Sequence, residues 1–195
     1  MNQKFRVAIF ASGNGSNAEE IIKYFKEHSS IQIVLVVTSN PEAYVLKRAA
    51  NFHIPSIVIN RQDFATTIVG RLAEYQITHI VLAGFLWLIP STLLKAYPNK
   101  VINIHPALLP KYGGKGMYGM KIHELVRATN EKETGITIHV IDDKYDEGPI
   151  VFQAKCEVQS TDTPQQIADK VHELEYKCYP KVIEQWILNE LNYSR

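Results

Sequence analysis

The chain has 195 residues, of which 46% are hydrophobic and 21% are charged, so it can bury one substantial core and hardly two. Its formal charge of +1, from 21 basic and 20 acidic residues spread along the chain, offers no basic arm or acidic tail to nucleic acid or to a membrane. We therefore expect one domain that acts on a small molecule.

The sequence leads directly into a strand-like run at Phe5, without the charged, apolar and small-residue segments of a secretion signal. No apolar run approaches the length of a membrane span. The two cysteines, Cys156 and Cys178, stand far apart and have neither C-x-x-C nor zinc spacing, which fits a reducing compartment. We expect a soluble, cytoplasmic protein.

In the first half of the chain, short runs rich in β-branched and aromatic residues alternate with stretches of helical period. Strands are predicted at residues 5–11, 31–38, 56–59 and 79–83. Helices are predicted at residues 17–27, 44–52 and 63–75, the last with Asp63 as its N-cap. This alternation is typical of a Rossmann-like α/β fold, a mostly parallel sheet with helices on both faces.

In the second half, strands are predicted at residues 101–105, 135–141 and 150–158, with one helix near residues 118–130. A long final helix is predicted to start after Thr163-Pro164, a cap and first-turn proline, and to run toward Leu191. The irregular stretch 106–117 is rich in glycine and proline, which is typical of a functional or mobile loop.

The loop after the first predicted strand, Ser12-Gly13-Asn14-Gly15-Ser16-Asn17, is suited to hold an anion, because its glycines allow a tight turn with backbone N–H groups at a helix N-terminus. Its G-x-G-x-x-A pattern also fits the dinucleotide-binding fingerprint. The second strand, however, ends in Thr38-Ser39-Asn40-Pro41, without the acidic residue or arginine that contacts the ribose of a dinucleotide. A terminal phosphomonoester is therefore favoured, and the alternative is a turn that holds nothing.

Two polar clusters are candidates for chemistry. Asn103 and His105 stand on one face at the end of the predicted fifth strand, the edge where α/β folds place ligands. The alternative there is a polar strand end capped by its own loop. The second cluster lies downstream and contains His139, Asp142, Asp143 and Asp146. An acidic surface turn is the favoured interpretation of Asp142 and, less firmly, of Asp143.

Three separated segments resemble signature segments of the folate-dependent formyltransferases: Asn103-Ile104-His105-Pro106-Ala107-Leu108-Leu109-Pro110, Gly135-Ile136-Thr137-Ile138-His139-Val140 and Tyr145-Asp146-Glu147-Gly148-Pro149-Ile150. The loop Gly13-Asn14-Gly15-Ser16-Asn17 is similar to that of family members that act on glycinamide ribonucleotide, and the likeness covers nearly the whole chain. The resemblance implies a single domain with the formyltransferase fold. Its phosphate-binding half would span about residues 1–100, and its catalytic and folate-binding half about residues 101–195.

The resemblance also implies an activity: transfer of the formyl group of 10-formyltetrahydrofolate to the amine of 5-phosphoribosylglycinamide in purine biosynthesis, without a metal. Small-molecule substrates, no nucleic acid or membrane partner, and a monomer or homodimer are expected. By the same resemblance the catalytic residues are Asn103, His105 and Asp146, and the phosphate-binding residues are Gly15, Ser16 and Asn17. Glu175 matches a ribose contact, with a solvated helix face as the alternative. The folate-binding positions are Arg61, Leu86, Trp87, Leu88, Ile89, Asn103, Ile141 and Asp143.

The residue types suit the reaction on chemical grounds. Attack on a formyl carbon creates an oxyanion, which the Asn103 amide and a protonated His105 can stabilise as donors. Asp146 can accept the proton of the attacking amine, directly or through water, and its charge is expected to raise the pKa of His105. His139 is expected to support this group. After Pro110 the sequence departs from the family pattern, so no substrate contact is assigned to the loop from Lys111 to Gly119.

Other activities share part of this pattern. Methionyl-tRNA formyltransferase and formyltetrahydrofolate hydrolase carry further domains, and a tRNA-binding surface requires more positive charge than +1. A formyltransferase that acts on an amino sugar nucleotide remains an alternative. So does a protein that binds a nucleotide phosphate without turnover, although such a protein has no need of an oxyanion site.

Overall fold

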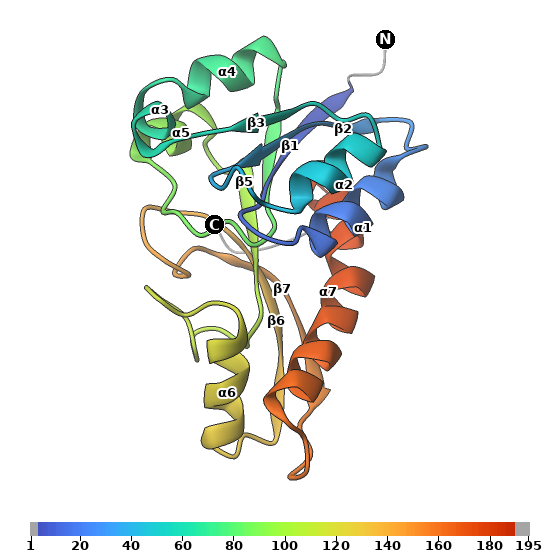
Figure 1. Cartoon of the computed structure of the whole chain (residues 1–195), viewed down its shortest axis with the longest axis vertical. Coiled ribbons are helices and arrows are strands. Elements are labelled where there is room, and N and C mark those ends of the chain that lie inside the picture. Colours follow the sequence, from blue (N-terminus) through green and yellow to red (C-terminus); the bar gives the residue numbers. More distant parts are fainter. Residues whose placement is uncertain (1–3, 190–195) are drawn as a thin grey trace. The chain divides into compact units, whose positions relative to one another are not determined.

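The protein is described by a computed structural model that covers residues 4–189. Figure 1 shows strands and helices that alternate along the chain. The strands are β1 (Phe5–Phe10), β2 (Ile31–Thr38), β3 (Ser56–Val58), β4 (His79–Leu82), β5 (Val101–His105), β6 (Glu133–Val140) and β7 (Ile150–Glu157). The helices are α1 (Ser16–Phe25), α2 (Val45–Asn51), α3 (Arg61–Thr66), α4 (Ile68–Glu74), α5 (Ser91–Ala96), α6 (Met120–Ala128) and α7 (Pro164–Ile187).

The strands form a seven-stranded sheet with the order β3-β2-β1-β4-β5-β6-β7. Pairing is parallel from β3 through β2, β1 and β4 to β5, and antiparallel between β6 and β7. The predicted α/β class, with a mostly parallel sheet and a long C-terminal helix, is confirmed. Among residues 4–189, no helix combines the length and the apolar character needed to cross a membrane.

The described residues form two compact units, which divide after Asn103. In the first unit β1 is the central strand, and Val7 through Phe10 are fully buried, as expected for a parallel strand covered on both faces. Phe10 pairs with Leu82 of β4, and Leu82 pairs with Asn103 of β5. The carboxyl ends of these three strands therefore meet at one edge of the sheet.

The second unit is built on the β6–β7 pair, against which α7 packs, and α6 packs in turn against α7. Gly135 of β6 permits this pairing, because a Cβ there would lie 1.9 Å from the carbonyl oxygen of Ala154 in β7. A buried apolar cluster beside these elements consists of Ala107, Ile122, Val126, Val158 and Ile167.

Several predicted boundaries need correction. One helix was predicted at residues 63–75, but two are present, and the N-cap is Asn60, whose side chain accepts a hydrogen bond from the Asp63 N–H at 2.9 Å. Asp63 therefore lies in the first turn rather than at the cap. Helix α5 was not predicted, because its six residues are too few to display a helical period.

The start of the final helix is confirmed, whereas its predicted end cannot be compared. Thr163 and Gln166 form a capping box, and Pro164 occupies the first turn. Helix α7 runs to Ile187, and Leu191, its predicted end, lies outside the described residues.

Two histidines, half-buried His79 and buried His123, are expected to make stability depend on pH. Burial, followed by the charge of Lys100, lowers the pKa of His79 to about 4. Burial, followed by His172 and His105, lowers the pKa of His123 to about 4. In the unfolded chain both rings titrate near about 6.5. As the pH falls between these values, the unfolded chain takes up protons that the folded chain does not, so the free energy of unfolding decreases.

We expect a loss on the order of 2 kcal/mol for each histidine between about pH 7 and about pH 5. Urea unfolding at a series of pH values measures this loss. The pH dependence should become shallower in His123→Asn, whose side chain does not titrate in this range. A free energy of unfolding that is constant across the series would contradict the lowered pKa of both rings in the folded protein.

Candidate active site

The loop after β1 leads into α1, with Gly15 as the N-cap. Gly15 has a φ of +76°, in the left-handed region, and a Cβ there would lie 2.4 Å from Cγ2 of Val45. Both the backbone conformation and the available space therefore require glycine. The predicted phosphate-binding residues Gly15, Ser16 and Asn17 thus lie at the first turn of a helix, where backbone N–H groups and the helix dipole favour an anion.

Arg48 of α2 forms hydrogen bonds with this loop. Its Nε donates to the carbonyl oxygen of Asn14 at 2.9 Å, and its Nη2 donates to Oδ1 of Asn14 at 2.8 Å. The remaining terminal nitrogen pairs with the carboxylate of Glu19 in α1. The guanidinium also lies 5.0 Å from the centre of the Tyr44 ring. The negative charge of Glu19, which would disfavour an anion, is therefore offset by Arg48.

The segment after β4 joins the same edge of the first unit. The Ser12 N–H donates to the carbonyl oxygen of Gly84 at 3.0 Å, and the Leu86 N–H donates to Oγ of Ser12 at 3.2 Å. Leu86 and Leu88 are 50% and 43% exposed, whereas Ile89 is buried. The segment 84–89 therefore presents two leucines to solvent beside the loop that follows β1.

Contacts between aromatic rings hold this segment in place. The ring of Phe85 lies 5.3 Å from that of Phe10 and 5.4 Å from that of Phe64, with edge-to-face geometry. Trp87 packs on Phe64 at 5.8 Å, and the guanidinium of Arg61 lies 4.6 Å from the centre of the Trp87 ring. The predicted folate positions Arg61, Leu86, Trp87 and Leu88 thus lie on one small part of the first unit.

A polar cluster forms in the second unit around Asp146. Nδ1 of His105 lies 3.6 Å from Oδ2 of Asp146, and Nε2 of His139 lies 3.6 Å from Oδ1 of the same carboxylate. The Gly114 N–H donates to Oδ2 of Asp146 at 2.9 Å. His105 and His139 are 3% and 0% exposed. Asn103 lies two residues before His105 in β5, on the same face of the strand.

The electrostatics of this cluster differ in part from expectation. Burial lowers the pKa of His105 below its ordinary value, although Asp146 and the Tyr112 carbonyl oppose this effect. The predicted net rise in the pKa of His105 is therefore wrong, because desolvation outweighs the carboxylate. Burial by itself raises the pKa of Asp146, but nearby His139, the charge of His105 and the hydrogen bond from the Gly114 N–H together hold it below its usual value. Asp146 is ionised at neutral pH.

The other predicted positions are dispersed. In the loop before Asp146, Ile141 and Asp142 are half-buried and Asp143 is exposed. Oδ1 of Asp142 accepts a hydrogen bond from the Lys144 N–H at 2.9 Å, as in an Asx turn, which agrees with the structural role expected for Asp142. Glu175 in α7 is only 5% exposed, so the alternative of a solvated helix face is wrong.

Among residues 4–189, no group of three or more histidine, cysteine, aspartate or glutamate side chains is arranged to hold a metal ion. Within the second unit, the buried polar cluster instead joins one carboxylate to two imidazoles and a backbone N–H. Such a group can hold and move protons.

Comparison with known proteins places this arrangement in a family. The family model described as "Formyl transferase" matches residues 5–183. The chain belongs to the formyl transferase family. Membership implies small-molecule substrates and a formyl donor derived from folate.

Individual formyl transferases are similar over most of their length. The phosphoribosylglycinamide formyltransferase of Bacillus subtilis is 41% identical over 187 residues, which cover 92% of this chain and 93% of that protein. A chloroplastic phosphoribosylglycinamide formyltransferase of Arabidopsis thaliana is 36% identical over 186 residues, which cover 91% of this chain and 64% of that protein. The structure of the Coxiella burnetii phosphoribosylglycinamide formyltransferase matches with a TM-score of 0.88 and 34% identity, covering 99% of this chain and 92% of that chain.

Three positions around the clusters were missed from the sequence. Arg48 gives no sequence signal, since an isolated arginine in a helix is usually solvated. Gly114 was recognised only as part of a glycine-rich loop. It has a positive φ of +97°, and its N–H donates to Asp146. Tyr112 contacts His105 through its backbone carbonyl, a group that every residue type carries. Sequence patterns therefore cannot single Tyr112 out.

Proposed function

We propose that this formyl transferase moves the formyl group of 10-formyltetrahydrofolate to the amine of 5-phosphoribosylglycinamide, a step of purine biosynthesis. The observation that carries the proposal is the buried cluster in which Asp146 lies between His105 and His139, each 3.6 Å away. It is supported by the likeness to relatives named phosphoribosylglycinamide formyltransferase, at 41% and 36% identity.

The cluster can supply the proton movements that the reaction needs. The amine nitrogen attacks the formyl carbon, the bond from that carbon to N10 of the folate breaks, and the amine proton passes on to N10. The Asn103 amide and the cationic form of His105 stabilise the tetrahedral oxyanion. Ionised Asp146 accepts the amine proton, directly or through water, and its lowered pKa makes it a temporary carrier that readily gives the proton up. His139 supports the carboxylate.

Each substrate has a candidate place. The first turn of α1, at Gly15, Ser16 and Asn17, suits the phosphate of the acceptor, and Glu175 suits its ribose. Two exposed leucines, Leu86 and Leu88, offer an apolar wall to the pterin. Further folate contacts are proposed for Arg61, Trp87, Ile89, Asn103, Ile141 and Asp143.

We also propose that both units belong to one formyltransferase domain that acts in the cytoplasm as a monomer or homodimer, without a metal. The Arabidopsis relative is named chloroplastic, so the location differs among members of the family.

Turnover assays identify the acceptor. The purified protein is offered 10-formyltetrahydrofolate with 5-phosphoribosylglycinamide, with an amino sugar nucleotide, with charged initiator tRNA, or with water alone. We expect turnover with 5-phosphoribosylglycinamide at a kcat/KM at least about 10⁴ M⁻¹s⁻¹, in the usual range of enzymes. Faster turnover of another acceptor would reassign the substrate, and binding of both ligands without turnover would indicate a sensor.

A further inference from the structure

The backbone carbonyl of Tyr112 contacts the buried histidine of the candidate site. Nε2 of His105 lies 2.8 Å from this oxygen and donates to it. Tyr112 has a φ of +57°, in the left-handed region that non-glycine residues rarely adopt. Such a conformation is unfavourable for a non-glycine residue and persists only where surrounding contacts hold it. The contacts of the Tyr112 side chain show what holds it.

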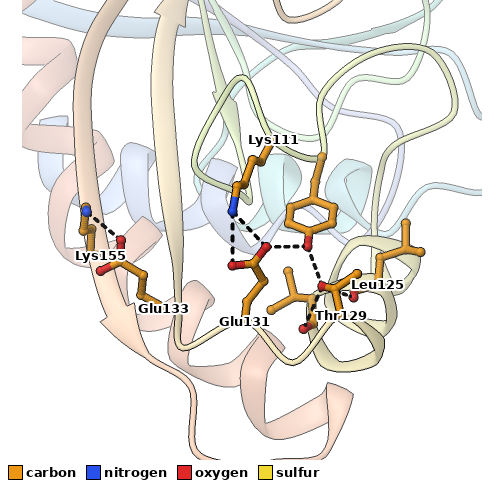
Figure 2. Close-up of polar contacts among 8 residues, drawn as sticks. Lys111, Leu125, Thr129, Glu131, Glu133 and Lys155 are labelled. Carbon is orange, nitrogen blue, oxygen red and sulfur yellow. Dashed lines mark hydrogen bonds and ion pairs between the residues drawn. The ribbon is translucent and has the colours of Figure 1, made fainter.

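Figure 2 shows the anchor of this segment. The Tyr112 hydroxyl donates to Oε1 of Glu131 at 3.0 Å and lies 2.6 Å from Oγ1 of Thr129. Nζ of Lys111 binds both oxygens of Glu131, at 3.0 and 3.3 Å. Oγ1 of Thr129 donates in turn to the carbonyl oxygen of Leu125 at 2.8 Å. The segment is therefore fastened to the end of α6 and to the residues before β6.

The two ring nitrogens of His105 consequently face two acceptors. Nε2 faces the Tyr112 carbonyl, and Nδ1 faces the carboxylate of Asp146. A neutral imidazole has one N–H and can satisfy only one acceptor, whereas the imidazolium has two. The carbonyl therefore favours both the orientation that turns Nδ1 toward Asp146 and the charged form of the ring. His139 opposes that charge, and the charge of His105 in turn lowers the pKa of His123.

We propose that Tyr112, anchored by Glu131 through its hydroxyl, is a positioning residue that holds His105 in the orientation and charge state used for formyl transfer. The kinetic part of this inference rests on the proposed function, whereas the state of the His105 ring can be measured in the free protein. Tyr112 need not touch either substrate for this role.

Removing the hydroxyl in Tyr112→Phe keeps the ring but releases the anchor. We expect kcat to fall about three- to tenfold, which corresponds to the usual net contribution of one hydrogen bond. Both KM values should change less than about twofold. Because the carbonyl raises the pKa of His105, its release should also lower that pKa. The high-pH limb of the kcat/KM profile should then move to lower pH.

Nitrogen NMR of the free protein tests the inference without any substrate. The His105 ring should deprotonate at lower pH in Tyr112→Phe than in the parent, and Glu131→Gln should shift it in the same direction. Lys155→Met is the matched control, because it breaks a neighbouring exposed pair in which Nζ lies 2.6 Å from Oε1 of Glu133. This control should leave the kinetics and the His105 titration unchanged.

Three results would overturn the proposal. The first is a His105 titration in Tyr112→Phe that superimposes on that of the parent. The second is a higher kcat in Tyr112→Phe, because the carbonyl would then block the ring rather than position it. The third is a loss of activity that follows only the folded fraction and leaves the pH profile in place. If no acceptor is turned over but the NMR shift is present, the proposed function fails while the positioning of His105 stands.

Discussion

Replacing Asp146 by asparagine is expected to lower kcat by about 10²- to 10⁴-fold, the usual cost of losing a positioned proton acceptor. The amide keeps the shape of the carboxylate, but it can no longer take a proton or bear the charge that faces His105 and His139. Binding of 5-phosphoribosylglycinamide should persist, since its phosphate is assigned to the first unit. Asp142→Asn is the matched control, because its amide oxygen can still accept from the Lys144 N–H.

The members of this group should act as a unit. Asn103→Ala removes an oxyanion donor and is expected to lower kcat by about 10²- to 10³-fold. Loss of the Asp146 charge should lower the pKa of His105 further, so Asp146→Asn and His105→Ala remove overlapping contributions. The double variant should be far more active than the product of the single effects predicts. Strictly multiplicative losses, or single variants within a few-fold of the parent, would contradict a common catalytic group.

A single methyl group at the phosphate loop is expected to have the second large effect. In Gly15→Ala the new Cβ would meet the side chain of Val45 at 2.4 Å, at a φ that favours glycine, so the loop must move. We expect the KM for 5-phosphoribosylglycinamide to rise about ten- to a hundredfold, as when one or two charge-assisted hydrogen bonds are lost. Steady-state kinetics with a thermal melt of the same sample separates this effect from unfolding.

Two controls make this result specific. Gly13 lies in the same loop, and nothing lies within 4 Å of a Cβ placed there, so Gly13→Ala should leave the KM nearly unchanged. Leu88→Asp, at a side chain that is 43% exposed, should weaken the folate and spare the ribonucleotide. If Gly15→Ala weakens both substrates equally while the protein stays folded, the loop is not a separate phosphate site.

The parts of the fold that the sequence predicted are those with a strong local signal. The buried parallel strands are continuous apolar runs, and Ile31–Thr38 was predicted at its observed bounds. The start of α7 was marked by a threonine and a proline that form the observed cap. Short elements were less clear: α5 has six residues, and a cap at Asn60 had to be distinguished from one at Asp63.

For the candidate site, side-chain types could be predicted and their environment could not. Asn103 and His105 were singled out by residue type and position, and the resemblance to the formyltransferases selected Asp146 from the second cluster. The structure brings His105 and Asp146 to 3.6 Å. The net lowering of the His105 pKa arises from burial by segments distant in sequence, which no local pattern reports. The contribution of Tyr112 is made by a backbone carbonyl and depends on a left-handed φ, so its residue type carries no signal for it.

The hydrogen bonds from Arg48 to Asn14 link the ordering of the loop after β1 to the folding of α2. A helix of seven residues is marginally stable by itself in water, so α2 depends on contacts of this kind. Coupling between two such equilibria is reciprocal: an anion that orders the loop stabilises the helix by the same free energy with which the ordered helix strengthens the anion's binding. If the acceptor's phosphate binds at this loop, as proposed, its binding also stabilises α2, and amino-acid changes in α2 outside the loop can tune substrate affinity over evolutionary time.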